Sequence, residues 1–319
     1  MSDPRVASPI PAAPGVGVVI LPARRRSRGR HVLLALAAIV ACRTIPQEAR
    51  VASVVDDAGV GVHLPAAPGR IVSLIPASTE LVFALGEADR LVGRTAWCDW
   101  PPDAEAIPNL GNGIDPSVEA VVGTRPDLVL LYRSGSNRAA AERLRGFRIP
   151  VLELEFNTLD DFRRITRLLG NVLGVQSRAD SLIARTDSAL ARVAPPVDTG
   201  GMHRPSVFIL VWDRPPMALG KGSFLSEIVN RAGARNIFDD MEAPSGPVSI
   251  EAVAERDPDF ILTTSASAPA FAGRSEWQVV RAARERRFLR VSGSEYNRPS
   301  PRMPDAVRAL ADSLRAKRR

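Results

Sequence analysis

Aromatic residues stand at three places in the sequence where a small-molecule site could form. Trp97 lies in the loop AWCDWPP (residues 96–102), while Tyr132 and Trp212 each end a run of apolar residues that is typical of a buried strand. Rings at strand ends are suited to stacking on a flat ligand, although packing within the loop is the alternative for Trp97. Its neighbour Trp100 precedes two prolines, and we expect it to pack against them.

Polar residues with the right chemistry accompany these rings. Ser78 lies in a strand-to-helix turn, and such turns present hydroxyl and backbone N–H groups at the carboxyl edge of an α/β sheet, where ligands bind. Tyr296 and Arg298 lie together in the segment 292–302 near the end of the chain. Stacking rings with one arginine suit a large, flat ligand that is anionic or rimmed with amides.

Residues that catalysis or metal binding would require are scarce. Beyond residue 41 the histidines are His63 and His203, both near expected element boundaries, so a direct zinc or manganese site fits poorly. No G-x-S-x-G motif occurs, and no histidine neighbours a plausible nucleophile. Cys98 is expected to be an unreactive free thiol, and Lys221 lacks P-loop spacing and belongs in a turn before a helix. These residues predict a binding protein with no catalytic residues, no cofactor and no bound metal ion.

An internal repeat reveals how the chain is organised. Residues 117–131 (SVEAVVGTRPDLVLL) and 249–263 (SIEAVAERDPDFILT) are identical at seven of fifteen positions. Each copy is expected to form a short helix, a Pro-Asp turn and a buried strand. A weaker pair, residues 79–86 and 226–233, predicts two helices that each end at a left-handed glycine.

A single amphipathic helix is expected between the two copies. Residues 177–193 carry apolar side chains at three-and-four spacing, Ser177 and Asp180 resemble a capping box, and Pro195 and Pro196 would stop the helix. About 17 residues span roughly 25 Å, long enough to run along two lobes. The expected fold class is therefore α/β, with two similar lobes joined by a long rigid backbone helix and a ligand cleft between them.

The amino terminus has the features of an export signal. Residues 24–31 are basic, residues 32–41 are apolar, and IVAC ends at Cys42. This sequence resembles the lipobox of bacterial lipoproteins, which implies cleavage before Cys42 and lipidation of its thiol; an ordinary signal peptide is the alternative. Residues 1–41 hold six arginines and one aspartate, so cleavage would lower the formal charge from +7 to +2 and leave no basic face for nucleic acid.

The expected domain boundaries follow from these patterns. The signal and an N-terminal extension occupy residues 1–41, and a lipidated tether with a hairpin turning near residues 57–59 occupies 42–69. The first lobe, the backbone helix and the second lobe with its basic tail are expected at 70–176, 177–194 and 195–319.

Taken together, these segments resemble one protein family. Residues 70–86 (RIVSLIPASTELVFALG), 99–102 (DWPP), both repeats and 298–302 (RPSPR) occur in an order that resembles the cobalamin, iron-siderophore and haem binding proteins of bacterial ABC importers. The chain most resembles the cobalamin-binding branch, over roughly residues 51–314. The resemblance implies a monomeric, extracytoplasmic receptor that holds a metal chelate between two lobes and delivers it to a permease dimer.

The resemblance also assigns residues, with some departures. The cleft aromatics of the cobalamin branch fall on Trp97 and Tyr132, and a cleft arginine falls on Arg298. Two further tryptophan positions fall at about Gly113 and Ser245, and an acid becomes Ser294. Trp212, one position from an aromatic of the family, is expected to compensate.

The sequence leaves open which ligand is bound and what role two equivalent acidic residues have. Cobalamin or a related corrinoid is the leading ligand; haem or a ferric siderophore is the alternative, as is an envelope enzyme or sensor subunit of the same fold. Glu119 and Glu251 are equivalent in the repeat. The family places permease-docking acids there, whereas favourable charge at a helix start is the other explanation.

Overall fold

The computed structural model describes residues 52–64, 67–193, 204–264 and 269–318, all of which fall in one compact unit, Gln47–Arg319. The strands are β1 Ala52–Val55, β2 Gly61–Leu64, β3 Ile71–Ser73, β4 Leu91–Arg94, β5 Leu128–Tyr132, β6 Val151–Leu154, β7 Ser206–Asp213, β8 Pro216–Leu219, β9 Arg235–Asn236, β10 Ser245–Pro247, β11 Phe260–Thr263 and β12 Phe288–Arg290. The α-helices are α1 Pro76–Ala84, α2 Val118–Gly123, α3 Arg138–Gly146, α4 Leu159–Leu173, α5 Gln176–Val193, α6 Phe224–Arg231, α7 Ile250–Glu255, α8 Arg281–Arg284 and α9 Met303–Arg318. The short 3-10 helices are η1 Ala88–Arg90, η2 Pro102–Ala106, η3 Ala270–Gly273, η4 Ser275–Val279 and η5 Ser294–Tyr296.

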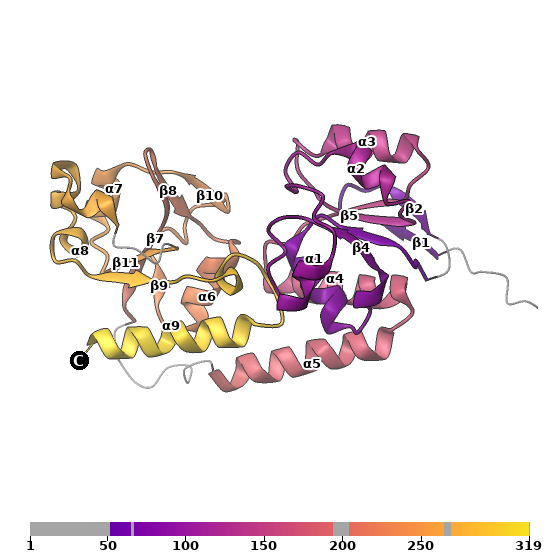
Figure 1. Ribbon diagram of the computed structural model, residues 1–319. Coiled ribbons are helices and arrows are strands. Elements are labelled where there is room, and N and C mark those ends of the chain that lie inside the picture. The colour runs from indigo at the N-terminus through magenta and orange to yellow at the C-terminus, as the bar shows by residue number, and fades with distance from the viewer. Residues whose placement is uncertain (1–51, 65–66, 194–203, 265–268, 319) are drawn as a thin grey trace, which may run out of the picture. The chain divides into compact units, whose positions relative to one another are not determined.

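A parallel sheet in the order β4-β3-β5-β6 forms the first lobe. Helices cover both of its faces, with α2 and α3 on one side and α1 and α4 on the other (Figure 1). Alternate residues of β5 face opposite layers: Leu128 and Leu130 pack toward α1 and α4, whereas Val129 and Leu131 pack toward α2 and α3. A strand buried on both faces must be apolar throughout, which explains the continuous apolar run in its sequence.

The second lobe repeats this plan with a mixed sheet. Its strand order is β10-β8-β7-β11-β12, with β9 paired to β7; β7, β11, β12 and β9 are parallel, and β8 and β10 are antiparallel. In β7, Val207 and Ile209 face α6 and α9, while Phe208 and Leu210 face the layer of α7, η4 and α8. The prediction of an α/β fold with two similar lobes is confirmed.

The internal repeat forms equivalent structures in the two lobes. Ser117 and Ser249 each accept a hydrogen bond from the backbone N–H three residues later, at 3.2 and 3.0 Å. Both helices end at a residue with φ −78° and ψ −7°, and a residue of positive φ follows in each copy, Arg125 and Asp257. The weaker pair is equivalent too, since α1 and α6 are each followed by a glycine of positive φ.

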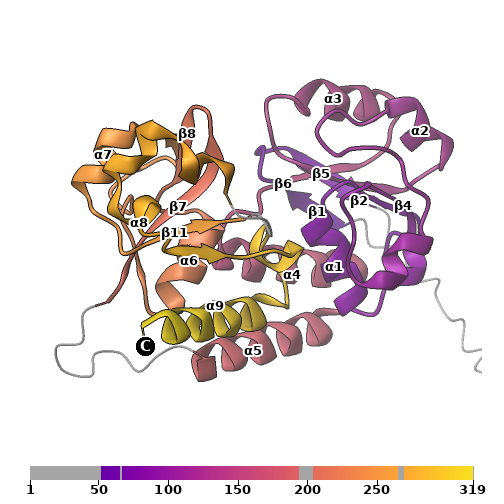
Figure 2. The same ribbon diagram turned by 60° about the vertical axis from the view of Figure 1, so that its left-hand side comes forward.

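The backbone helix α5 lies alongside both lobes. It packs against α4 of the first lobe and against α9, which follows the second sheet (Figures 1 and 2). Five residues of the stripe expected from the sequence are buried, namely Ala179, Leu182, Ile183, Thr186 and Leu190, while the expected Ala189 and Val193 are half-buried. The helix begins at Gln176, so the predicted capping box of Ser177 and Asp180 is wrong, because Ser177 already lies inside the helix. Pro195 and Pro196 lie outside the described residues.

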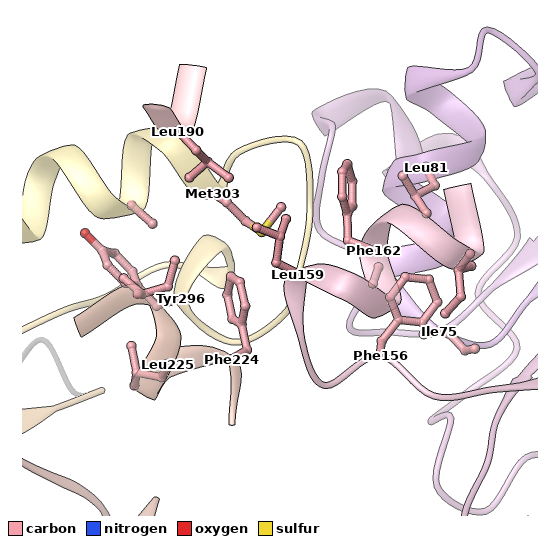
Figure 3. Close-up of a cluster of buried hydrophobic side chains, with 14 of the residues drawn as sticks. Ile75, Leu81, Phe156, Leu159, Phe162, Leu190, Phe224, Leu225, Tyr296 and Met303 are labelled. Carbon is pink, nitrogen blue, oxygen red and sulfur yellow. The ribbon is translucent and has the colours of Figure 1, made fainter. Parts of the chain in front are cut away.

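One hydrophobic core runs from lobe to lobe. Leu159, at the start of α4, lies between Phe224 and Met303 on one side and Phe162 on the other (Figure 3). All four side chains are at most 6% exposed. Apolar packing therefore fixes the lobes at the side of the molecule where α4, α5 and α9 lie.

The N-terminal hairpin is also as predicted, with Gly59 in a left-handed conformation at its turn. Asp56 in that turn is 4% exposed and pairs with Arg145 at 3.0 Å, which ties the hairpin to the first lobe. Within the described residues, no helix is long and apolar enough to cross a membrane.

Candidate functional site

The carboxyl edges of the two sheets carry the residues from which a site can be built. In the first lobe, β4 leads into the loop of Trp97, β3 into α1 and β5 into Tyr132. In the second lobe, Trp212 is the last residue but one of β7, and β12 leads into the segment of Arg298. Hydrogen bonds from Arg298 to the first lobe bring these two edges together. Open α/β sheets bind ligands at this edge.

Two tryptophan rings are exposed, one on each lobe. Trp97 is 65% exposed, and Trp212 is 63% exposed. The indole Nε1 of Trp212 donates to the carbonyl oxygen of Arg214 at 2.8 Å, which orients the ring without burying it. Exposed tryptophan rings at the ligand-binding edge of an α/β sheet are candidates for stacking on a ligand.

Tyr132 is half-buried at the end of β5, and its hydroxyl donates to Asn157 Oδ1 at 2.8 Å. Burial raises the pKa of this phenol, and the nearby carboxylate of Glu155 adds to the effect. The hydroxyl therefore remains protonated at neutral pH, and its hydrogen bond ties the end of β5 to the segment that follows β6.

A buried carboxylate joins the lobes beside these rings. Glu80, on α1, has a side chain only 2% exposed. Arg298 Nε donates to its Oε1 at 2.6 Å, and Arg302 donates through Nη2 to Oε1 at 2.9 Å and through Nε to Oε2 at 3.1 Å. Both arginines belong to the second lobe, so this cluster is an ionic contact between the lobes.

Arg298 uses all three guanidinium nitrogens within the protein. Besides Glu80, it bonds the Trp97 carbonyl oxygen through Nη1 at 3.4 Å and Asp99 Oδ1 through Nη2. Partial burial acts to raise the pKa of Asp99, but the hydrogen bond and charge of Arg298 outweigh it and hold that pKa below its ordinary value. Asp99 thus remains ionised and paired.

Trp100 has a different role from Trp97. The Arg302 guanidinium lies 4.6 Å from the centre of the Trp100 ring, a cation–π contact, and Arg302 also pairs with Glu295 at 2.8 Å. This contact is consistent with the expectation that Trp100 packs within the protein and does not bind a ligand. Its contact is with Arg302, whereas the sequence predicted packing against the two prolines.

Two of the expected ligand residues are buried instead. Ser78 is fully buried, and its hydroxyl donates to the Ile75 carbonyl oxygen at 2.9 Å and lies 2.7 Å from Ser73 Oγ. Helix α1 begins at Pro76 with Ile75 as its cap residue, so Ser78 lies inside the helix and not in the strand-to-helix turn expected from the sequence. Tyr296 is 7% exposed and lies in the core between the lobes (Figure 3). Neither side chain offers a surface to a ligand in this structure.

Gly113 and Ser245 occupy the two positions at which the resembling branch carries tryptophan, and their surroundings differ. A Cβ at Gly113 would lie 2.4 Å from the Leu74 carbonyl oxygen, so this backbone excludes any side chain there. Ser245 begins the edge strand β10 and is exposed. Ile114, which follows Gly113, is 68% exposed and adds apolar surface to the loop of Gly113.

A polar pocket also lies where α4 begins, next to α6. Its volume is about 790 Å³, and its lining includes Thr158, Lys221, Glu227 and Arg231. Glu227 accepts a hydrogen bond from the Leu159 backbone N–H at 3.0 Å and pairs with Arg231 at 2.9 Å, so the charge of Glu227 is compensated within the protein. None of the four predicted aromatic residues, Trp97, Tyr132, Trp212 and Tyr296, lines this pocket. Lys221 lies in the turn before α6, as expected.

The two acids of the repeat are placed alike but differ in partners. Glu119 and Glu251 both lie in the first turn of their helices and are exposed. Glu119 pairs with Arg143 of α3 at 2.8 Å, and its pKa is lowered by backbone hydrogen bonding and by that arginine. No ion pair joins Glu251 to another described residue.

Glu80, Arg302 and the pairing role of Asp99 were not identified from the sequence. The available signal was Glu80 itself, the one charged residue of its helix. Cys98 is buried, with its Sγ 3.1 Å from Thr79 Oγ1. Across the described residues, no group of three or more His, Cys, Asp or Glu side chains is arranged to hold a metal ion. Cys42 lies outside the described residues.

Comparisons with known proteins agree with this architecture. Residues 71–292 match the model of a family described as periplasmic binding protein. A vitamin B12-binding protein of Pectobacterium carotovorum is 28% identical over 251 residues, covering 79% of this chain and 90% of that protein. The ABC transporter substrate-binding lipoprotein YvrC of Bacillus subtilis is 30% identical over 269 residues, covering 82% and 84%.

A solved structure matches as well. The periplasmic vitamin B12 binding protein of Vibrio cholerae superposes with a TM-score of 0.64 at 25% identity, covering 79% of this chain and 98% of that one. The similarity thus extends over both lobes and the helix between them.

The buried cluster yields a stability prediction. Replacing Glu80→Ala leaves two covered guanidinium groups without their shared carboxylate, which we expect to cost about 3–5 kcal/mol of unfolding free energy. Glu295→Ala removes a partner of Arg302 that is 26% exposed and should cost about 1 kcal/mol or less. Urea unfolding followed by near-ultraviolet circular dichroism measures both. Equal unfolding midpoints for the two variants would show that Glu80 does not hold the lobes together.

Proposed function

Because the chain belongs to the periplasmic binding protein family, we propose that it is the lipid-anchored receptor that delivers cobalamin or a related corrinoid to an ABC importer. The family and the relatives already give its broader functional class. The chain is an extracytoplasmic substrate-binding protein of an ABC importer, of the group that takes vitamin B12, haem or siderophore-like ligands. Such proteins are transport components rather than enzymes, and they carry a transported ligand rather than a cofactor.

The exposed tryptophan pair supports a corrinoid most directly. Trp97 and Trp212 present rings from opposite lobes, and two rings can sandwich a broad planar macrocycle. The nearby arginine is already paired with Glu80 and Asp99, which leaves little positive charge for a strongly anionic ferric chelate. The relatives named for vitamin B12 binding support the same ligand.

The anchoring part of the proposal rests on the sequence around Cys42. A basic run, ten apolar residues and IVAC precede the first strand by about ten residues, which leaves a short tether between lipid and protein. The Bacillus relative named as a lipoprotein supports this assignment. Two or more acyl chains hold a protein stably at a membrane.

Glu119 and Glu251 form the proposed docking pair. Their equivalent positions in the repeat place one exposed carboxylate on each lobe, which suits a permease built from two equivalent subunits. Exposed charges of this kind mainly steer and orient an encounter.

The corrinoid assignment is tested by titrating purified protein with cyanocobalamin, haemin and a ferric hydroxamate while recording absorbance. We expect cyanocobalamin to bind and each of Trp97→Ala and Trp212→Ala to weaken it by about 1–3 kcal/mol. Because both rings are exposed, the melting temperature should hardly change. Phe147→Ala, which removes an aromatic ring 59% exposed on α3's C-terminal end, is the matched control. Tight binding of haemin alone would refute the corrinoid proposal.

Anchoring is tested with Cys42→Ser, since a serine cannot carry the thioether-linked lipid. The variant should move from the membrane pellet to the soluble extracytoplasmic fraction, while the wild type stays in the pellet. A variant that still sediments with membranes contradicts lipidation at this residue.

Docking is tested by measuring uptake of radiolabelled cyanocobalamin in cells that carry Glu119→Ala, Glu251→Ala or both. Each single change should slow uptake, the double change should slow it further, and the affinity for cyanocobalamin should stay constant. The effect of Glu251→Ala should be the larger one, because Arg143 already neutralises part of the charge of Glu119. Wild-type uptake by the double variant would leave the two acids only as favourable charges at helix starts.

A further inference from the structure

The ionic cluster between the lobes carries more negative than positive charge. Three carboxylates, those of Glu80, Asp99 and Glu295, contact two guanidinium groups, those of Arg298 and Arg302, which leaves a net charge of −1. The arginine that the resemblance assigns to the ligand is therefore part of a group that is anionic overall.

The accessible part of this cluster is its anionic part. The side chain of Asp99 is 53% exposed, whereas those of Arg298 and Arg302 are 12% and 16% exposed. The side chain of Glu80, which both arginines contact, is only 2% exposed. A molecule that approaches the cluster from solvent meets the carboxylate of Asp99 before either cation.

This carboxylate adjoins the proposed stacking surface. Asp99 lies two residues after Trp97, and Arg298 bonds both the Trp97 carbonyl oxygen and Asp99. A ring stacked on Trp97 would carry its peripheral groups close to Asp99. Neutral amide groups can donate hydrogen bonds to a carboxylate, whereas a second carboxylate is repelled.

We propose that Asp99 is a specificity-determining residue that admits amide-rimmed ligands and excludes carboxylate-rimmed ones from the surface beside Trp97. The inference rests on the proposed function and narrows it, because corrinoids exist in both forms. Amidated corrinoids such as cobinamide would be accepted, and the corrin carboxylic acids from which amidation reactions produce them would be rejected.

The test compares two probes that share one ring system, dicyanocobinamide and dicyanocobyrinic acid, which carry amide and carboxylate side chains respectively. Affinities are measured by absorbance titration of the purified protein at low ionic strength. The wild type should bind the amide form at least about tenfold more tightly, since unscreened like charges near a protein surface cost that much or more. Asp99→Asn keeps the shape and the hydrogen bond to Arg298 but removes the charge, so it should reduce this ratio by about threefold or more.

Two controls separate charge exclusion from other effects. Asp103→Asn removes the same charge from an exposed residue of η2 in the same loop and should leave the ratio nearly unchanged. An unchanged melting temperature of Asp99→Asn would show that the fold is intact.

The outcomes are distinct. The role of Asp99 is overturned if Asp99→Asn and the wild type show the same ratio of affinities for dicyanocobinamide and dicyanocobyrinic acid. It is also overturned if the wild type prefers dicyanocobyrinic acid. Failure of every corrinoid to bind overturns the proposed function instead. The specificity role is then decided with haemin and its dimethyl ester, for which the ester should be favoured by the wild type and the preference reduced in Asp99→Asn.

Discussion

The carboxylate of Glu80 is removed from water where the two lobes meet, and its free energy depends on Arg298 and Arg302 remaining beside it. An uncompensated buried charge is so costly that the two lobes cannot separate here without disrupting the cluster. The same three residues hold α1, the loop after β4 and the segment that enters α9 in fixed relation. Apolar packing around Leu159 and along α5 then adds a second, independent junction (Figure 3).

A rigid junction leaves ligand recognition to what lies exposed beside it. Trp97 and Trp212 remain accessible because neither is needed for the core, and each is held by the backbone or by a single hydrogen bond. The cluster contributes a carboxylate rather than a free guanidinium, since Arg298 is fully occupied within the protein. In the proposed function, stacking area would supply the affinity for the ligand, and the charge of Asp99 would supply the discrimination between ligands.

Much of this architecture could be predicted from the sequence because its signals are local and repeated. The pairs of helix, turn and strand recur with the same caps, and the stripe on α5 follows directly from helical spacing. The direction of side chains at the sheet edge could not be predicted. Ser78 and Tyr296 lie at the expected edge but face the interior, because a hydroxyl can bond a backbone carbonyl there and a phenol ring can fill the interlobe core. Pairings such as that of Glu80 with Arg302 join residues 222 positions apart, which no spacing in the sequence reveals.

The most direct test of this account is a crystal structure of the protein with cyanocobalamin. The account predicts a corrin ring between Trp97 and Trp212, with Arg298 still bonded to Glu80 and Asp99 and the amide rim facing Asp99. A ligand held in the polar pocket beside Lys221 and Arg231, or an Arg298 that has left Asp99 to bind the ligand, would contradict it.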